Sequence, residues 1–152
     1  MIMPLPLSDQ LAGLPVFSAF APSTLAALAE NGTERAAAAG ETLLSRDRDV
    51  DSFLFLLEGR WTMRRFVRGV AEPLVWRDEE PGAWASGVAA LEAIAPTDLF
   101  ADRPCRVLDA PRALAHGLMA EDPAFAARIL RDIHRWSERL SVHAALMRAR
   151  GP

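Results

Sequence analysis

Residues 51–60 read Asp-Ser-Phe-Leu-Phe-Leu-Leu-Glu-Gly-Arg, and this stretch decides the fold class of the 152-residue chain. The apolar residues Phe53 to Leu57 follow one another without a polar interruption, as in a strand buried on both faces. Glu58-Gly59 then provides a tight turn into a second segment, residues 60–68, so that the two segments predict a hairpin. The sequence therefore predicts an antiparallel β core at the centre of the chain.

Further strands and helices are expected on both sides of this centre. Helically spaced apolar residues before Asn31-Gly32 predict helices near the N-terminus, and this dipeptide is a stop signal. Additional strands are expected at residues 41–45, 72–77 and 105–108. A short helix is expected from Gly87 to Ala93, with Ser86 as its N-cap.

Two helices are predicted after the last strand. Asp109 and Pro111 mark the start of the first, and Asp122-Pro123 opens a longer helix over residues 122–149. Apolar residues step mostly by three and four along this longer helix: Phe125, Ile129, Ile133, Trp136, Leu140 and Met147. Such a stripe faces either the protein's own core or a second copy of the chain. We predict a homodimer whose contact helix carries Ile129, Ile133, Trp136 and Leu140.

Composition and charge exclude several classes of protein. The chain has 51% hydrophobic and 24% charged residues, which is the mixture of one folded globular domain spanning residues 1–152. Its formal net charge of -3 gives no general attraction to nucleic acid or to an anionic membrane. Apart from histidine every basic residue is arginine, so lysine Schiff bases and the phosphate-loop lysine are excluded.

The single cysteine and the termini indicate the compartment. Cys105 alone allows neither an intrachain disulfide nor a multi-cysteine metal site, and its place in a predicted strand indicates a buried thiol. No apolar run approaches the roughly 18 residues of a membrane-spanning helix, and the proline-broken N-terminus lacks the basic start of a signal peptide. We expect a cytoplasmic protein with a flexible tail over residues 1–10 and no DNA-binding domain after the last helix.

Charged patterns elsewhere carry weaker hypotheses. One set matches the acidic positions of a calcium loop: Asp47, Asp49, Asp51 and Glu58. Ser52 stands where that loop needs glycine, and a strand follows, so a polar loop without metal is favoured.

His134 and Glu138 lie four residues apart on one helix face, which is typical of a surface hydrogen bond. Arginines cluster in residues 60–68 and along residues 128–139, where a solvated helix face is favoured. No nucleophile has a matching base, so we expect no enzyme, no cofactor and no metal site.

The stretch from Pro81 to Leu91 is the best candidate for a ligand site. A glycine-bearing turn leads into the predicted short helix, whose first amides have no partner within the helix. Free amides together with the helix dipole favour an anion such as phosphate. The candidate ligand-binding residues are Trp84, Ser86, Gly87, Val88 and Ala89. A plain loop-to-helix junction is the alternative, and the local sequence alone favours it.

The order of these elements resembles the cyclic-nucleotide-binding domain family, the sensor module of catabolite-activator-type regulators, cyclic-nucleotide-dependent kinases and gated channels. The likeness extends from about Leu11 to about Met147. Its strongest points are Gly40-Glu41 at a strand start, Glu58-Gly59-Arg60 at the turn, and Pro81-Gly82. The resemblance implies an α+β fold, in which an antiparallel, jelly-roll-like β-roll is flanked by N-terminal helices and a long C-terminal helix.

The family binds its ligand through a phosphate-binding cassette, in which a glutamate accepts the ribose hydroxyl and an arginine pairs with the phosphate. In register from Pro81-Gly82, the family's glycine falls on Ser86 and its glutamate on Gly87. The arginine falls among residues 93–97, which contain none. The resemblance thus implies the fold together with an altered pocket. The candidates for substitute anion contacts are Arg77, Arg103 and Arg106, and the last helix, which often covers the ligand in the family, contains Trp136.

These residues leave three hypotheses open. The first is a stand-alone, non-enzymatic sensor domain that takes a small anionic ligand in an altered pocket or has lost nucleotide binding. The second is a ligand-free module that dimerises and docks onto a protein partner. The third is a cyclic AMP binder that uses contacts outside the family pattern.

Overall fold

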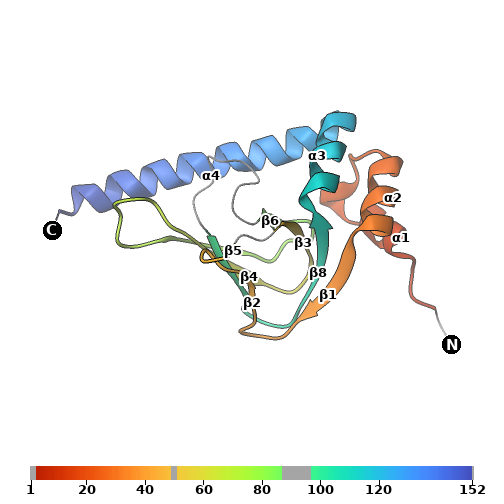
Figure 1. The fold of residues 1–152 in the computed structure, drawn as a ribbon, viewed down its shortest axis with the longest axis horizontal. Coiled ribbons are helices and arrows are strands. Elements are labelled where there is room, and N and C mark those ends of the chain that lie inside the picture. Colours follow the sequence, from red (N-terminus) through yellow and green to blue (C-terminus); the bar gives the residue numbers. More distant parts are fainter. Residues whose placement is uncertain (1–2, 49–50, 87–96, 152) are drawn as a thin grey trace.

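Two antiparallel sheets and a set of helices make up the structure, a computed structural model that describes residues 3–48, 51–86 and 97–151 (Figure 1). The helices are α1 (Leu7–Ala12), the 3-10 turn η1 (Pro15–Phe17), α2 (Pro22–Asn31), α3 (Arg112–Glu121) and α4 (Pro123–Ala149). The strands are β1 (Thr33–Ala37), β2 (Thr42–Leu44), β3 (Ser52–Glu58), β4 (Trp61–Arg65), β5 (Leu74–Asp78), β6 (Trp84–Ser86), β7 (Thr97–Ala101) and β8 (Cys105–Pro111). The expected α+β class with an antiparallel β-roll is confirmed.

The strands form a helix-side sheet in the order β1-β8-β3-β6 and an outer sheet in the order β2-β7-β4-β5. Side chains alternate along β3, so that Phe53 and Phe55 pack with the helices while Leu54 and Leu56 pack with the outer sheet. The helix-side sheet is therefore the middle of three layers. This position explains why Phe53 to Leu57 form an unbroken apolar run.

The predicted hairpin between residues 53–57 and 60–68 is wrong. After β3 the chain turns at Gly59 and passes from the helix-side sheet into the outer sheet, where β4 pairs with β7 and β5. Gly59 has a φ of 109°, and a Cβ atom there would lie 2.5 Å from the carbonyl oxygen of Pro104. The glycine thus allows a sharp corner between sheets, a role that the local sequence does not distinguish from a hairpin turn.

Helix α4 runs from α3 across the edge strands of both sheets (Figure 1). The carboxylate of Asp122 caps its N-terminus by accepting hydrogen bonds from the amides of Ala124 at 3.0 Å and Phe125 at 3.4 Å. The helix then contacts β6 through Trp84 and β5 through Trp76. It closes the side of the β-roll between these strands, which we call the mouth, and the expected C-terminal helix is confirmed.

Other boundaries differ from the expectations. Asp109 does not cap α3: it lies within β8, and α3 begins at Arg112 after Pro111. Helix α1 begins at Leu7, inside the stretch expected to be a tail. Strands β1, β6 and β7 are short and carry weak patterns, and the sequence did not predict them. The expected helix over Gly87–Ala93 lies outside the described residues. No helix in the described part of the chain has the length and apolar character needed to span a bilayer.

Candidate functional site

Aromatic side chains from both sheets and from α4 meet at the mouth of the β-roll. The ring centroids of Trp84 on β6 and Trp136 on α4 lie 4.5 Å apart at an interplanar angle of 53°. Phe53 stacks on Trp84 with a centroid distance of 5.3 Å. On the other side of the mouth, the guanidinium of Arg139 lies 3.9 Å from the ring centroid of Trp76. The apolar bodies of these rings fill the space between α4 and the two sheets.

Two carboxylates hold three of the tryptophans in place. Asp132 on α4 accepts hydrogen bonds from the indole N–H of Trp84 at 2.9 Å and from Nε of Arg128 at 2.8 Å. Asp78 on β5 accepts from two indoles, those of Trp61 at 2.9 Å and of Trp76 at 3.0 Å. Burial raises the pKa of Asp78, while the hydrogen bonds from Trp61 and Trp76 act in the opposite direction.

Arg65 is a charged residue that points into the roll. It shares one face of β4 with Trp61 and Met63, which point into the core between the sheets, and only 1% of it is exposed. Its guanidinium carbon lies 4.2 Å from the ring centroid of Trp136, and Nη2 lies 3.5 Å from Sδ of Met63. Nε and Nη1 are buried and have no hydrogen-bond partner among the described residues. Burial lowers the pKa of Arg65 to about 10, with nearby Asp78 opposing this shift, so the side chain stays protonated at neutral pH.

Ser86 is a second buried polar group at the mouth. It ends β6 two residues after Trp84, so both side chains lie on the same face of the strand. Ser86 is 4% exposed, and its Oγ has no hydrogen-bond partner in the part of the chain that the structure describes. A cavity of about 70 Å³ lies at the mouth, between the tryptophans and the carboxylates, with Trp76, Asp78, Trp84, Asp132 and Trp136 among its lining residues. It is well below the roughly 300–1,000 Å³ of an ordinary small-molecule pocket.

The structure separates the candidate ligand-binding residues into groups. It brings Trp84 and Ser86 to the mouth, whereas Gly87, Val88 and Ala89 lie outside the described residues. The three arginines considered as substitutes form ion pairs elsewhere: Arg77 with Asp102 at 4.0 Å, Arg103 with Glu79 at 2.9 Å, and Arg106 with Glu34 and Glu58. Arg65 reaches the mouth from β4, in addition to Arg128 and Arg139 of α4. The alternation of Trp61, Met63 and Arg65 along one strand was the signal that could have found it.

The apolar stripe of α4 packs largely within its own chain. Ile129 and Trp136 are buried in the core under the helices, and Ile133 packs against the same core. Leu140 is half-buried. The large apolar side chains that α4 exposes are others: Leu130, Val142 and Leu146, which are 56%, 59% and 57% exposed.

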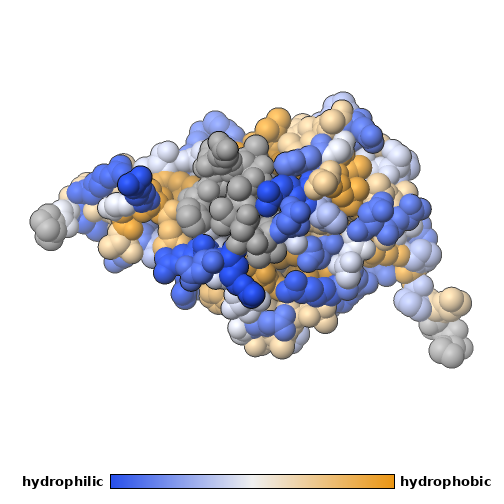
Figure 2. All heavy atoms as spheres, in the orientation of Figure 1, coloured by the Kyte–Doolittle hydropathy of each residue, from blue (hydrophilic) through white to orange (hydrophobic). Residues whose placement is uncertain are grey.

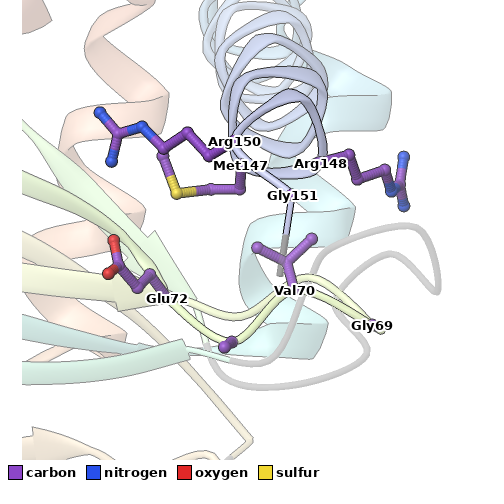
Figure 3. A pocket seen from close by; sticks show the side chains of 8 residues that line it. Gly69, Val70, Glu72, Met147, Arg148, Arg150 and Gly151 are labelled. Atoms are coloured by element: carbon purple, nitrogen blue, oxygen red, sulfur yellow. The ribbon is translucent and has the colours of Figure 1, made fainter.

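Surface hollows lie along the C-terminal half of α4, away from the mouth. Residues 69–72, in the connection between β4 and β5, and the end of α4 enclose a cavity of about 240 Å³ (Figure 3). Val70 points toward the end of α4, Met147 extends to the same side of the helix as Arg150, and Arg148 points to the opposite side (Figure 3). Leu74, Val142 and Leu146 line a shallower groove nearby. On the face seen in Figure 2, hydrophobic atoms reach the surface in this part of the molecule, bordered by hydrophilic residues.

The other patterns noted in the sequence have structural roles. Asp51 pairs with Arg112 at 3.1 Å, and Asp49 of the calcium-like set lies outside the described residues. His134 and Glu138 lie 3.3 Å apart on the exposed side of α4. Cys105 is buried in β8, and burial raises the pKa of its thiol. In the described ranges, no three acidic, histidine or cysteine residues group as a metal site.

The described residues have the fold of cyclic-nucleotide-binding domains, which confirms the resemblance at the level of fold. The catabolite activator protein of Thermus thermophilus matches with a TM-score of 0.64 and 16% identity, over 88% of this chain and 62% of that chain. The regulatory domain of Toxoplasma gondii PKA, solved with cAMP, matches with a TM-score of 0.68 and 13% identity, over 84% and 49%. A cAMP-binding acyltransferase from Mycobacterium smegmatis matches with a TM-score of 0.62 and 22% identity, over 82% and 38%.

These likenesses are structural. Neither a family model nor a curated protein sequence matches the chain. The chain spans 64%, 46% and 62% of the first solved chains that it resembles. The solved neighbours are mostly regulatory proteins named for cAMP or for cyclic nucleotides, and the acyltransferase shows that the same fold also occurs beside a catalytic activity.

Proposed function

We propose that this chain acts as a non-enzymatic regulatory domain of the cyclic-nucleotide-binding fold whose pocket is altered, so that cyclic AMP and cyclic GMP bind weakly or not at all. The observation that carries the proposal is the packing at the mouth. Trp136 of α4 lies 4.5 Å from Trp84 of β6, and the cavity beside them measures about 70 Å³. This packing supports the proposal, because a cavity of this size is too small for a nucleotide.

The sequence at the cassette supports the same proposal. Gly87 stands where the resembled family carries a ribose-binding glutamate, and residues 93–97 contain no arginine for the phosphate. Hydrogen bonds to charged groups contribute about 1.5–3 kcal/mol each. Losing both contacts removes roughly 3–6 kcal/mol, which is about a hundredfold to ten-thousandfold in affinity.

The non-enzymatic part of the proposal rests on the chemistry of the mouth. Ser86 contributes a hydroxyl group there, and within residues 3–48, 51–86 and 97–151 its Oγ has no hydrogen-bond partner that could take its proton. The carboxylates Asp78 and Asp132 are engaged with indole and guanidinium donors. Because a nucleophile needs an adjacent base, this arrangement favours ligand binding or the transmission of a signal over covalent catalysis.

Isothermal titration calorimetry of the ligand-free chain with cyclic AMP and cyclic GMP tests the altered pocket. We expect dissociation constants of about 1 mM or weaker, because a micromolar binder of this fold would lose at least a hundredfold. A dissociation constant in the low micromolar range for either nucleotide would contradict the proposal.

A second candidate function is dimerisation or docking through α4, and the exposed side chains Leu130, Val142 and Leu146 favour it. Apolar residues scattered singly are normal on a surface, but Val142 and Leu146 lie one turn apart beside a groove that also includes Leu74. Sedimentation of the chain at tens of micromolar, with Leu146→Glu as the variant, tests self-association. A homodimer that the variant disrupts supports this function, and a strict monomer contradicts the homodimer.

A further inference from the structure

Arginine and apolar side chains share the side of the outer sheet that is turned away from the core, which we call the outer face. In the register of this sheet, Arg64 of β4 lies opposite Val75 of β5 and Asp98 of β7, so these side chains form one row. Two residues further along their strands, Arg77 of β5 and Phe100 of β7 point to the same side. The other side of the sheet packs into the core between the two sheets. The arginines of β4 and β5 on the outer face are exposed, so this face is a surface of the molecule.

Aromatic rings hold two arginines in place at the outer face. The guanidinium carbon of Arg46, which follows β2, lies 3.9 Å from the ring centroid of Phe66, and that of Arg64 lies 5.1 Å from the ring centroid of Phe100. Such contacts hold a guanidinium by its flat side and leave the N–H donors at its edge. Within residues 3–48, 51–86 and 97–151, neither of these two guanidinium groups is in an ion pair. Their donors are therefore not used by the part of the chain that the structure describes.

The charge of the outer face is opposite to that of the chain. The formal net charge of the chain is -3, whereas the outer face combines Arg46, Arg64 and Arg77 with Asp98. The carboxylate of Asp98 accepts a hydrogen bond from the backbone amide of Arg46 at 2.8 Å. The side chain of Arg77 is 63% exposed and approaches the carboxylate of Asp102 only to 4.0 Å. A positive face on a negatively charged chain indicates that the complementary negative charge belongs to a partner.

We propose that the outer face binds an acidic segment of a partner protein, in which carboxylates are combined with apolar side chains. A carboxylate matches the planar guanidinium fork in a hydrogen-bonded pair with two contacts. The apolar side chains of the segment fit Val75, which lies beside Arg64 and is 47% exposed. The inference goes beyond the proposed function, because the outer face and the mouth lie on opposite sides of β4: Arg64 points to Phe100 and Arg65 to Trp136.

A nucleic acid fits the outer face less well than an acidic protein segment does. Single-stranded nucleic acid is held by aromatic rings on which its bases stack, but guanidinium groups already cover the rings of Phe66 and Phe100. A phosphate backbone carries a charge at every nucleotide, and it would meet the carboxylates of Asp98 and, at the end of the face, Asp102 and Glu79. A protein segment can space its carboxylates so that they avoid these groups.

The test titrates the full chain into fluorescently labelled probes and follows fluorescence anisotropy at about 50 mM salt. The main probe is a short peptide in which glutamate and leucine are separated by serine. Two control peptides carry glutamine or lysine in place of glutamate, and a short oligothymidine is the nucleic acid probe.

Three variants of the chain separate the outer face from the overall charge. The test variant replaces the arginines of the outer face by glutamine: Arg46→Gln, Arg64→Gln and Arg77→Gln. The matched control removes the same charge from exposed arginines at α4: Arg131→Gln, Arg148→Gln and Arg150→Gln. A lysine variant of the outer-face arginines keeps the charge and loses the planar fork. Because all these positions are exposed, we expect the variants to fold, and the lysine variant keeps the test valid if the glutamine variant does not.

We expect the glutamate peptide to bind the wild type with a dissociation constant of about 0.1–1 mM, and the glutamine and lysine peptides to show no saturable binding. The glutamine variant should weaken the binding at least about tenfold, and the lysine variant about two- to fivefold. The matched control should bind as the wild type does. Raising the salt to about 500 mM should weaken the binding, because exposed ion pairs are screened.

Each outcome decides for or against the acidic segment. Binding of the glutamate peptide that the glutamine variant loses and the matched control keeps supports the inference. Equal losses in these two variants would show a general attraction by charge and would overturn it, and so would the absence of binding up to about 5 mM peptide. Tighter binding of the oligothymidine than of the glutamate peptide, lost in the same variant, would overturn the protein partner and assign the face to nucleic acid. None of these results depends on nucleotide binding at the mouth, so a failure here leaves the proposed function standing.

Discussion

The indole N–H of Trp84 donates a 2.9 Å hydrogen bond to the carboxylate of Asp132, and this buried contact joins β6 of the roll to α4. The same oxygen of Asp132 accepts from Nε of Arg128 one turn earlier on the helix. The Trp84 bond joins the helix to the sheet, whereas the Arg128 bond lies within α4 and orients the carboxylate.

We expect Asp132→Ala to lower the free energy of unfolding by about 1–3 kcal/mol, because it leaves the Trp84 indole buried without an acceptor. Asp132→Asn keeps a carbonyl oxygen at the site and should cost less. Urea unfolding followed by tryptophan emission measures both effects. Glu138→Ala is the control on the same helix: its partner His134 is exposed, so we expect a change within about 0.5 kcal/mol. Equal effects of Asp132→Ala and Glu138→Ala would contradict the assigned role.

Asp122 connects the two helical ends of the molecule. Besides capping α4, its carboxylate accepts from the hydroxyl of Thr24 at 2.7 Å and from the amide of Ala21 at 2.9 Å, at the start of α2. Burial alone would raise the pKa of Asp122, but the hydrogen bonds from Ala21, Thr24, Phe125 and Ala124 outweigh it and hold the pKa below its ordinary value. The ionised carboxylate is therefore the stabilising form.

For an acid whose pKa is lower in the folded state, the stabilisation is complete above the unfolded-state pKa and is lost as the pH falls through the folded-state pKa. We expect Asp122→Ala to cost about 1–2 kcal/mol at pH 7. The difference between wild type and variant should shrink as the pH falls below about 4. Urea unfolding at pH 7 and at pH 3 measures it. A difference that stays constant between these two values would show that the charge of Asp122 does not contribute.

The central strand β3 and the long helix α4 could be predicted because local sequence patterns indicate them. The apolar run Phe53 to Leu57 identified β3, and Asp122-Pro123 marked the start of α4. The partner of β3 could not be predicted. Gly59 turns the chain between two sheets, and the space that forbids a side chain there comes from Pro104 and Cys105, more than 40 residues away. Pairing of this kind is set by tertiary contacts and not by the local turn.

The candidate site likewise contains residues that the sequence singled out and one that it did not. Trp84 and Ser86 were candidates from the sequence because they stand at the start of the cassette, whereas Arg65 was noted only as part of the arginine cluster in residues 60–68. Strand alternation separates the adjacent arginines: Arg64 points outward over Phe100, and Arg65 points inward to Trp136. Which face of β4 is buried depends on the outer sheet, and that sheet includes β7, which was not predicted.

The turn at Pro81-Gly82 provides a test of one of the residues that carried the family resemblance. Gly82 has a φ of 98°, and a Cβ atom there would lie 2.7 Å from Cβ of Val16. Gly69 has a φ of 78° but no atom within 4 Å of such a Cβ. Both Gly→Ala variants therefore carry left-handed strain, and only the one at position 82 carries a clash.

We expect Gly69→Ala to cost about 1–2 kcal/mol and Gly82→Ala to cost a further 1–3 kcal/mol, roughly, from overpacking against Val16. Thermal unfolding of the two variants beside the wild type measures the difference. If Gly69→Ala proved as destabilising as Gly82→Ala, the close approach between this turn and η1 would have no energetic importance.

Trp136 and Leu146 lie on the same helix but in opposite environments, and comparing them distinguishes core packing from self-association. Trp136 is 6% exposed among side chains of its own chain, whereas Leu146 is 57% exposed. Trp136→Ala should lower the free energy of unfolding by about 3–5 kcal/mol, as expected for a large buried aromatic residue. Leu146→Ala should change it by less than about 0.5 kcal/mol if the chain is monomeric.

Unfolding at about 1 µM and at about 100 µM protein then distinguishes a dimer from a monomer, because the stability of a dimer rises with concentration and that of a monomer does not. For this comparison Trp136→Phe serves as a milder substitution. If Leu146→Ala removes the concentration dependence and Trp136→Phe preserves it, the dimer contact lies on the exposed face of α4. A dependence removed by Trp136→Phe and unaffected by Leu146→Ala would instead support the stripe of Ile129, Ile133, Trp136 and Leu140.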